Sequence, residues 1–397
     1  ASDVYKRQGK YLFNGSFRRD GSSAFSYTGN QWQNFYSAGA GWLMTEEEFM
    51  KDISWLDMLK LKGSWGTLGN QNLDTAYPAE PLLENAFGAV FGNPSTIYPG
   101  YQLAYLPNAN LRWEKVEAWE AGFESNMFRN RLHVEGVYYK KNTKDLLAKV
   151  PGLSGTVPGI GNLGQIENKG VELSATWRDQ IGDWGYNVGV NLTTIKNKVK
   201  SLVQDGYSII AGDKSQSYTM AGYPIGFFYG YKVDGVYQSQ ADIDASPKNT
   251  LATVTPGDLK FADVNGDGEI TPADRTLIGD PTPDVTYGIS LGVSYKGWEL
   301  GIDMMGQGGN QIYRTWDNYN WAQFNYMEQR LDRWHGEGTS NTQPVLNTGH
   351  AINFENSEYY VEDGSFFRIR NLQLGYTFDK ALISKICLLY TSPSPRD

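Results

Sequence analysis

A run of acidic and amide side chains between Asp263 and Asp274 has the spacing that most directly indicates chemistry. It fits the pattern D-x-[DN]-x-[DN]-G, which begins a calcium loop of the EF-hand type. A hard cation needs six or more oxygen ligands, and this spacing wraps them around one point. The expected ligands are Asp263, Asn265, Asp267, the Glu269 carbonyl, Thr271 and Asp274. We predict a structural Ca²⁺ bound with an affinity on the order of 10⁻⁴–10⁻³ M.

Two departures from the calcium pattern leave a second interpretation open. Asp274 stands where such loops carry a bidentate Glu, and no helix is expected before Asp263. The alternative is a polar turn followed by a helix start, with Thr271 as N-cap, Pro272 as first helical residue and Asp274 as the capping-box acid. The two interpretations are compatible, because a calcium loop of this kind also ends in a helix.

Catalytic constellations are poor, and we expect no enzyme. The three histidines, His133, His335 and His350, are isolated in the sequence, and His133 alternates onto the polar side of its segment beside Glu135. Neither a Walker motif nor a cysteine-based metal pattern is present in the sequence.

Aromatic side chains are concentrated in two segments that we expect to be loops. The faces of Tyr and Trp suit stacking on sugar rings or a protein interface, and a locally packed loop core is the alternative. The candidates for contact with substrate or a partner are Tyr313, Trp316, Tyr319 and Trp321 in one segment and Phe228 and Tyr229 in the other.

The composition excludes several protein classes. The chain has 397 residues, 14% of them aromatic and 20% charged, which is too rich in core-forming residues for a disordered chain. Its longest unbroken apolar run, Ile386 to Tyr390, is far shorter than a membrane-spanning helix. A net charge of −9 with no basic stripe argues against nucleic acid as a partner.

Strict alternation of apolar and polar residues is the main signal along the chain. In 286–296, for example, Tyr287, Ile289, Leu291, Val293 and Tyr295 share one face. About ten such segments are present, roughly 9–15 residues long, whereas strands of soluble sheets are most often about 5–6 residues long. The segments centre on 11–17, 36–42, 59–65, 119–123, 132–138, 171–178, 186–193, 286–296, 298–304 and 372–378.

Short and long connections also alternate between these segments. Tight turns are expected at 127–131, 179–184 and 296–297, and long connections at 67–110, 143–162, 200–284 and 311–363. Short turns at one end and long loops at the other are typical of an outer-membrane β-barrel, whose strands must pair all round because lipid offers the backbone no hydrogen bonds. The apolar face would then contact lipid, whereas in a soluble antiparallel sandwich it would turn inward.

Both ends differ from the rest of the sequence. Residues 1–8 and 386–397 break the pattern of their neighbours and resemble translated adapter sequence at the ends of assembled fragments, with a native linker as the alternative. We therefore expect the fold to occupy 9–385 and both ends to be non-native.

Seven strings, in order, carry a resemblance to one family. They are KYLFNGSFRRDGSSAF from Lys10, LKLKGSWGTLGNQN from Leu59, RWEKVEAWEAGFE from Arg112, GNLGQIENKGVELSATW from Gly161, GYPIGFFYGYKVDGVYQ from Gly222, DVNGDGEITPADRTLIGDPTPDVTYG from Asp263 and SFFRIRNLQLGYTF from Ser365. With them the chain resembles the C-terminal part of the SusC/RagA-like TonB-dependent outer-membrane transporters.

The resemblance implies an all-β antiparallel transmembrane barrel of about 22 strands, of which this chain supplies about ten. It also implies an energised importer of oligosaccharides, sometimes peptides, in the outer membrane of a Gram-negative bacterium. A SusD-like surface lipoprotein would close the barrel, and TonB would act through an N-terminal region and a plug that this chain lacks. The segments from Lys200 and from Gln311 are candidates for lid contact.

The sequence leaves two alternatives to an importer open, a nonspecific porin and a soluble all-β carbohydrate-binding protein. About ten strands leave two open edges, so we expect the 397-residue chain alone neither to insert nor to transport. Conducting, heat-modifiable pores formed by the purified chain would contradict this expectation.

Overall fold

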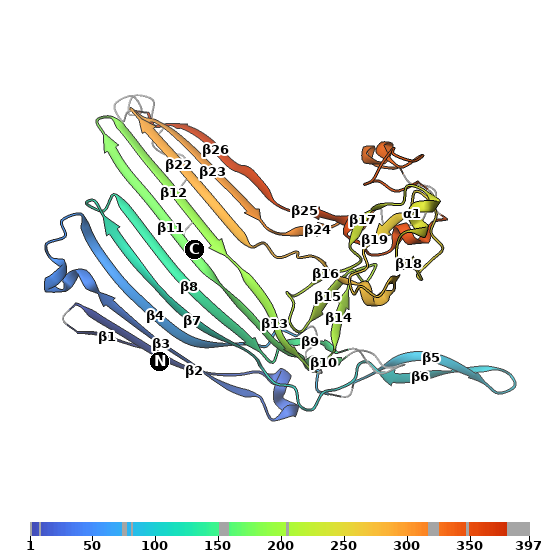
Figure 1. Cartoon of the computed structure of the whole chain (residues 1–397). Helices are drawn as coiled ribbons and strands as arrows, with labels where there is room; N and C mark the ends of the chain where they lie inside the picture. Colours follow the sequence, from blue (N-terminus) through green and yellow to red (C-terminus); the bar gives the residue numbers. More distant parts are fainter. Residues whose placement is uncertain are drawn as a thin grey trace.

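A single curved antiparallel sheet dominates the computed structural model of the chain (Figure 1). The structure describes residues 2–7, 9–73, 78–80, 82–150, 159–203, 206–316, 325–346 and 349–378. The sheet has 12 strands in the order β1-β2-β3-β4-β7-β8-β11-β12-β22-β23-β26, with β13 beside β11. Strands β1 and β26 are its two edges, so the described sheet is an open part of a barrel wall.

All ten strands predicted from alternation are present. The long strands are β2 (Tyr11–Gly21), β3 (Trp32–Leu43), β4 (Leu56–Asn70), β7 (Glu114–Met127), β8 (Leu132–Lys144), β11 (Gly164–Ile181), β12 (Trp184–Thr194), β22 (Val285–Tyr295), β23 (Trp298–Gly308) and β26 (Phe366–Tyr376). The sheet also contains β1 (Ser2–Arg7) and β13 (Lys196–Leu202). At 18 residues, β11 is longer than expected, because it pairs with β12 at one end and with β13 at the other.

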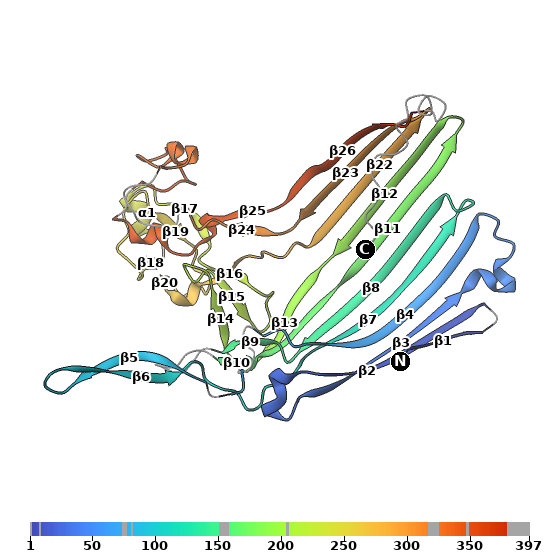
Figure 2. The ribbon, with the colours of Figure 1, turned by 180° about the vertical axis from the view of Figure 1, so that it is seen from behind.

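Short turns gather at one end of the sheet and long connections at the other (Figures 1 and 2). The turn between β22 and β23 is Lys296-Gly297, with φ of 44° and 88°, the left-handed conformation that a two-residue hairpin requires. The predicted turn at 179–184 is tighter than expected, because Ile181 still pairs with Trp184. We call these two ends of the sheet the turn end and the loop end.

The strand from Ser2 to Arg7 pairs along its whole length with β2. This pairing describes the backbone and does not test the origin of residues 1–8, so their non-native character stays a prediction. Residues 386–397 lie outside the described part of the chain.

The apolar face of the sheet is not covered by a second layer of the described chain. Leu173 is 44% exposed and Val293 is 40% exposed, while Ile289 and Leu291 are half-buried among their strand neighbours. A soluble sandwich would bury these side chains between two sheets. The sandwich interpretation is therefore excluded for this sheet, and its apolar face is uncovered, as a lipid-facing barrel wall requires.

The buried apolar clusters lie toward the loop end, in and beside the long connections. Phe25, Phe35, Leu111, Trp113 and Ile160 form one cluster beside β3. The other two clusters lie in the connections β12–β22 and β23–β26. Among the residues described, no helix has the length and apolar character needed to cross a membrane.

The connections contain short elements of their own. Four are hairpin strands, β5 (Leu83–Phe91), β6 (Thr96–Leu103), β9 (Leu147–Val150) and β10 (Gly159–Asn162). The connection β12–β22 carries β14 (Ser208–Ala211), β15 (Ser217–Met220), β16 (Phe227–Gly230), β17 (Val233–Val236), α1 (Gln240–Asp244), β18 (Lys248–Asn249), β19 (Leu259–Phe261), β20 (Glu269–Ile270) and β21 (Thr276–Gly279). The connection β23–β26 carries β24 (Gln311–Tyr313) and β25 (Val361–Asp363). Short 3-10 helices are Ser23–Thr28, Met44–Glu46, Glu48–Met50, Pro272–Asp274, Glu328–Asp332, Ala351–Phe354 and Glu358–Tyr360.

Candidate functional site

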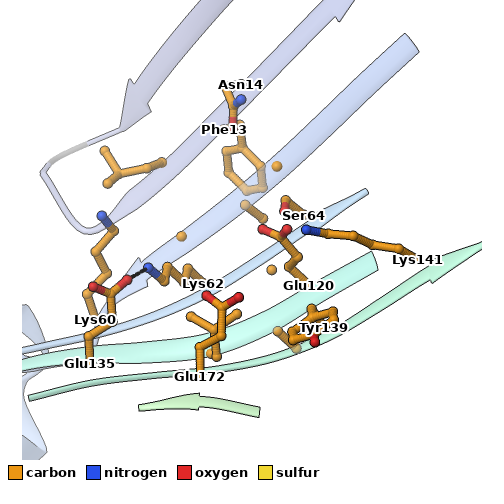
Figure 3. A pocket seen from close by; sticks show the side chains of 18 residues that line it. Phe13, Asn14, Lys60, Lys62, Ser64, Glu120, Glu135, Tyr139, Lys141 and Glu172 are labelled. Carbon is orange, nitrogen blue, oxygen red and sulfur yellow. Dashed lines mark hydrogen bonds and ion pairs between the residues drawn. The ribbon is translucent and has the colours of Figure 1, made fainter. Parts of the chain in front are cut away.

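The face of the sheet opposite the apolar face is lined by polar side chains, and we call it the polar wall. Lys60 of β4 is paired with Glu124 of β7, and Ser64 is paired with Glu120. Because side chains alternate along a strand, Lys62 points to the same side as these residues. Glu135 of β8 is paired with Glu124 and lies on the same side. The polar wall thus places opposite charges on adjacent strands (Figure 3).

Ion pairs hold the charged part of the polar wall. Lys62 pairs with Glu135, and Lys60 Nζ lies 3.5 Å from Glu124 Oε2. The Lys62 and Glu135 side chains are about one-third exposed, at 33% and 37%, so water screens the attraction and each pair contributes little to stability. Their main effect is to keep this surface hydrophilic.

A hollow of about 470 Å³ opens on this part of the wall. Small residues on the neighbouring strands leave this space unfilled. Gly39 and Gly41 of β3 stand beside Ser64 and Lys62 of β4. Tyr139 and Glu172 close the far side of the hollow (Figure 3). Such a surface suits the water-filled interior of a barrel and offers hydrogen bonds to a polar solute.

His133 lies on this same wall, as expected, and its Nδ1 is 2.6 Å from Asn126 Oδ1. Across the described ranges, no group of three or more His, Cys, Asp or Glu side chains is arranged to hold a metal ion.

The described parts of the connections β12–β22 and β23–β26 fold together into one body, which we call the loop unit (residues 206–284, 309–316, 325–346 and 349–365). Its first link is backbone pairing: the Tyr231 N–H donates to the Asn356 carbonyl, and the Glu358 N–H donates to the Tyr231 carbonyl, both at 2.9 Å. Figures 1 and 2 both show the two connections side by side beyond the loop end.

The core of the loop unit draws on both connections. Tyr231, Leu259, Phe261 and Ile270 come from the first, and Ile352 from the second; each is at most 1% exposed. The Tyr231 and Phe261 rings stack with centroids 4.7 Å apart. Since each connection alone would leave this surface in water, the burial stabilises the joined form.

A buried polar cluster around Asp258 adds directional hydrogen bonds to the apolar contacts of this core. Asp258 is fully buried, and its carboxylate accepts hydrogen bonds from the Thr255 N–H at 2.8 Å and from Asn353 Nδ2 at 2.9 Å. His350 Nδ1 lies 2.5 Å from Asp258 Oδ1. His350 is isolated only in the sequence; the fold brings it against Asp258.

The predicted calcium segment lies within the loop unit, and its side chains bond to their own backbone. The Asp263 carboxylate accepts from the N–H groups of Gly266 and Gly268 at 2.7 and 2.8 Å. Asp267 Oδ1 accepts from the Glu269 N–H at 2.9 Å. Gly266 and Gly268 have φ of 76° and 85°, so the left-handed turn uses both glycines.

Asp274 has the capping role of the alternative interpretation. Thr271 and Asp274 form a capping box on the 3-10 turn Pro272–Asp274. Asp274 is fully buried; burial acts to raise its pKa, but backbone hydrogen bonds from Thr271, Asn265 and Val264 outweigh it and hold the pKa below the ordinary value. The capping interpretation is confirmed, and Ca²⁺ binding by these residues stays a prediction.

The aromatic candidates that the structure describes differ in burial. Phe228 and Tyr313 are buried together, with ring centroids 5.5 Å apart, which favours the local-core interpretation for this pair. Tyr229 is half-buried against Tyr218, whereas Trp316 is 52% exposed. Tyr319 and Trp321 lie outside the described residues.

Sequence reasoning missed the residues that join the two connections. Asp258, Asn353 and His350 carry no motif, and Asp258 lies more than ninety positions from each of the other two. In the sequence these three residues differ from their neighbours only in being polar within segments rich in apolar residues. That difference does not show which of them contact each other.

Comparison with known proteins agrees with this geometry. The family model described as "TonB dependent receptor-like, beta-barrel" matches residues 1–386. TonB-dependent receptor P3 of Formosa agariphila is 32% identical over 398 residues, covering 96% of this chain and 38% of the relative. TonB-dependent receptor SusC of Bacteroides thetaiotaomicron is 29% identical over 400 residues, covering 94% and 37%. The chain therefore spans less than two-fifths of these relatives.

A solved structure has the same arrangement of strands. The RagAB peptide transporter superimposes with a TM-score of 0.80 and 25% identity, over 96% of this chain and 41% of that one. The antiparallel order, the open sheet, the outward apolar face and the sequence match all agree. The chain thus belongs to the TonB-dependent receptor β-barrel family, a family of transporters, and within it resembles the SusC and RagA proteins.

Proposed function

We propose that the intact protein carrying this chain is an energised importer in the outer membrane of a Gram-negative bacterium. The observation that carries the proposal is that one face of the sheet is apolar and the other is polar. Leu173 and Val293 are exposed on one face, and the ion pair of Lys62 with Glu135 lies on the other. In a barrel wall the first face contacts lipid and the second borders water.

The long connections support the orientation of the wall. In outer-membrane barrels the short turns are periplasmic and the long loops extracellular. The loop unit would then stand on the cell surface, where cargo arrives. Its buried core makes it a preformed surface rather than a set of flexible loops.

The partners follow from the resemblance and from this surface. We infer that a SusD-like lipoprotein closes the barrel from outside and that TonB acts through a region outside this chain. The RagAB protein, which this chain resembles in structure, is a peptide transporter, and we infer that the cargo here is an oligosaccharide or a peptide. Trp316, exposed on the loop unit, is our candidate for cargo or lid contact.

Uptake measurements in a host that lacks the gene test the proposal. Cells complemented with the intact gene should accumulate fluorescent oligosaccharides or peptides of the preferred class, and cells without TonB or without the neighbouring lipoprotein should not. Trp316→Ala should reduce uptake, with the exposed Trp298→Phe at the turn end as control. Uptake that persists without TonB would instead indicate a nonspecific pore and overturn the proposal.

A further inference from the structure

A lysine-rich patch lies on the outward face of the sheet, at the loop end. It spans β7, β8, β11 and β13, because residues paired across antiparallel strands point to the same side. The patch consists of Lys115, Lys140, Lys144, Lys169, Lys196, Lys198 and Lys200, together with Glu117 and Glu167. Seven lysines against two glutamates make it strongly basic, although the chain has a net charge of −9.

The patch adjoins the belt of outward-facing aromatic residues. Lys140 is the direct cross-strand partner of Trp119, which is 54% exposed. Tyr138, two positions before Lys140, is 49% exposed, and the Trp65 ring packs 5.9 Å from Trp119. Trp and Tyr mark the interface between hydrocarbon and headgroups. The lysines therefore stand at the depth of the lipid headgroups.

Like charges face one another directly within the patch. The paired positions are Lys115 with Lys144, Lys140 with Lys169, and Lys169 with Lys196. Like charges placed opposite each other destabilise a sheet unless a counter-charge lies between them. The paired lysines repel each other when no anion is present, and a bound anion would offset this repulsion.

The internal counter-charges are too few for this number of lysines. Glu167 reaches Lys140 Nζ at 3.1 Å, Lys200 at 3.9 Å and Lys169 at 4.0 Å, and Glu117 reaches Lys144 at 2.7 Å. Among the ion pairs of the described residues, none involves Lys115, Lys196 or Lys198. The side chains of Lys140, Lys144, Lys169 and Lys200 remain 41% to 47% exposed.

We propose that the lysine-rich patch binds the phosphate-bearing headgroup of a lipid in the outer leaflet surrounding the barrel. The lipid chains would lie along Tyr138 and Leu173, and its phosphate would sit among Lys140, Lys169 and Lys200. Glu167 holds these three lysines together in the absence of the lipid. The proposal rests on the outward, lipid-facing direction of this face but not on transport itself.

Lipid binding to the intact protein in detergent tests the proposal, with phosphatidic acid and diacylglycerol of the same chains as probes. Native mass spectrometry should show a clear preference for phosphatidic acid. Replacing three lysines together (K140Q, K169Q, K200Q) should weaken that binding by more than about tenfold. The matched control removes the same charge elsewhere (K141Q, K232Q, K248Q) and should leave the preference unchanged.

Glu167→Gln provides a test in the opposite direction. Removing this negative charge should tighten phosphatidic acid binding by roughly fivefold, whereas a purely structural ion-pair cluster would only be loosened. Equal binding of the two lipids, equal loss in the control triple, or displacement by millimolar inorganic phosphate would each overturn the proposal. A protein that transports cargo but lacks the lipid preference refutes this inference alone. A protein that is not recovered in the outer-membrane fraction refutes the proposed function.

Discussion

Asn353 Nδ2 donates a hydrogen bond to Asp258 Oδ1 at 2.9 Å, although the two residues are 95 positions apart and both are buried. Asn353 Oδ1 in turn accepts from the Leu259 N–H at 2.8 Å. One amide thus joins the connection β23–β26 to the connection β12–β22 by two hydrogen bonds. This contact joins the two connections in addition to their backbone pairing and their shared apolar core.

We predict that Asn353→Ala loosens both connections together. It leaves the Asp258 carboxylate and the Leu259 N–H without their partner, and each buried orphan group costs about 1–3 kcal/mol. Hydrogen exchange of the intact protein should show lost protection in both parts of the loop unit. Asn110→Ala, at an exposed position of another connection, is the control. Loss confined to the connection that carries Asn353 would contradict the coupling.

A second prediction concerns Ca²⁺. Titration calorimetry at millimolar Ca²⁺ should show binding that Asp263→Ala and Asp267→Ala abolish, with an affinity on the order of 10⁻⁴–10⁻³ M. Glu269 is expected to contribute only its carbonyl, so Glu269→Gln should bind normally. If the wild type releases no heat that these variants remove, the segment is only a capped turn.

The third prediction is a pH dependence centred on Asp242. Lys260 Nζ donates to it at 2.9 Å and the Gln238 N–H at 3.1 Å, and the two together hold its pKa below the ordinary value of 3.8. A lowered pKa in the folded state stabilises the fold above the ordinary value, and this contribution is lost as the pH falls through the folded value.

Asp242→Asn should therefore lower loop-unit stability at neutral pH and lose less stability than the wild type on acidification. Exchange protection, corrected for intrinsic rates, measured between pH 6 and pH 3 would show this. Asp244→Asn, on the exposed side of the same helix, is the control. Identical acid profiles for wild type and Asp242→Asn would rule out the assignment.

The fourth prediction compares two adjacent residues of β11. Leu173 points to the apolar face, midway between Lys169 and Trp177, and Ser174 points to the polar wall. Leu173→Arg should destabilise the intact barrel in lipid vesicles by about 2–4 kcal/mol, and Ser174→Arg should cost far less. Urea unfolding in vesicles measures both. Equal losses of stability in the two variants would contradict the assignment of one face to lipid and the other to water.

Local pattern determined much of this structure. The alternation of apolar and polar residues located all ten predicted strands, because side chains point to opposite faces at every second residue whatever the partner strand is. The face of His133 and the capping box at Thr271 and Asp274 followed from short-range spacing in the same way. The family was evident from the strings along these strands.

What only the tertiary structure decided is the set of contacts between distant segments. Alternation shows that Lys140 and Lys169 face outward, but cross-strand register alone places them opposite each other. Likewise, nothing near Asp258 in the sequence points to Asn353. Phe228 and Tyr313 were candidates for contact with substrate or a partner, with local packing as the alternative, and only the tertiary structure places their rings against each other. Such pairs form because burying the joined surfaces of two long connections outweighs the entropy of ordering them, a balance that no local spacing records.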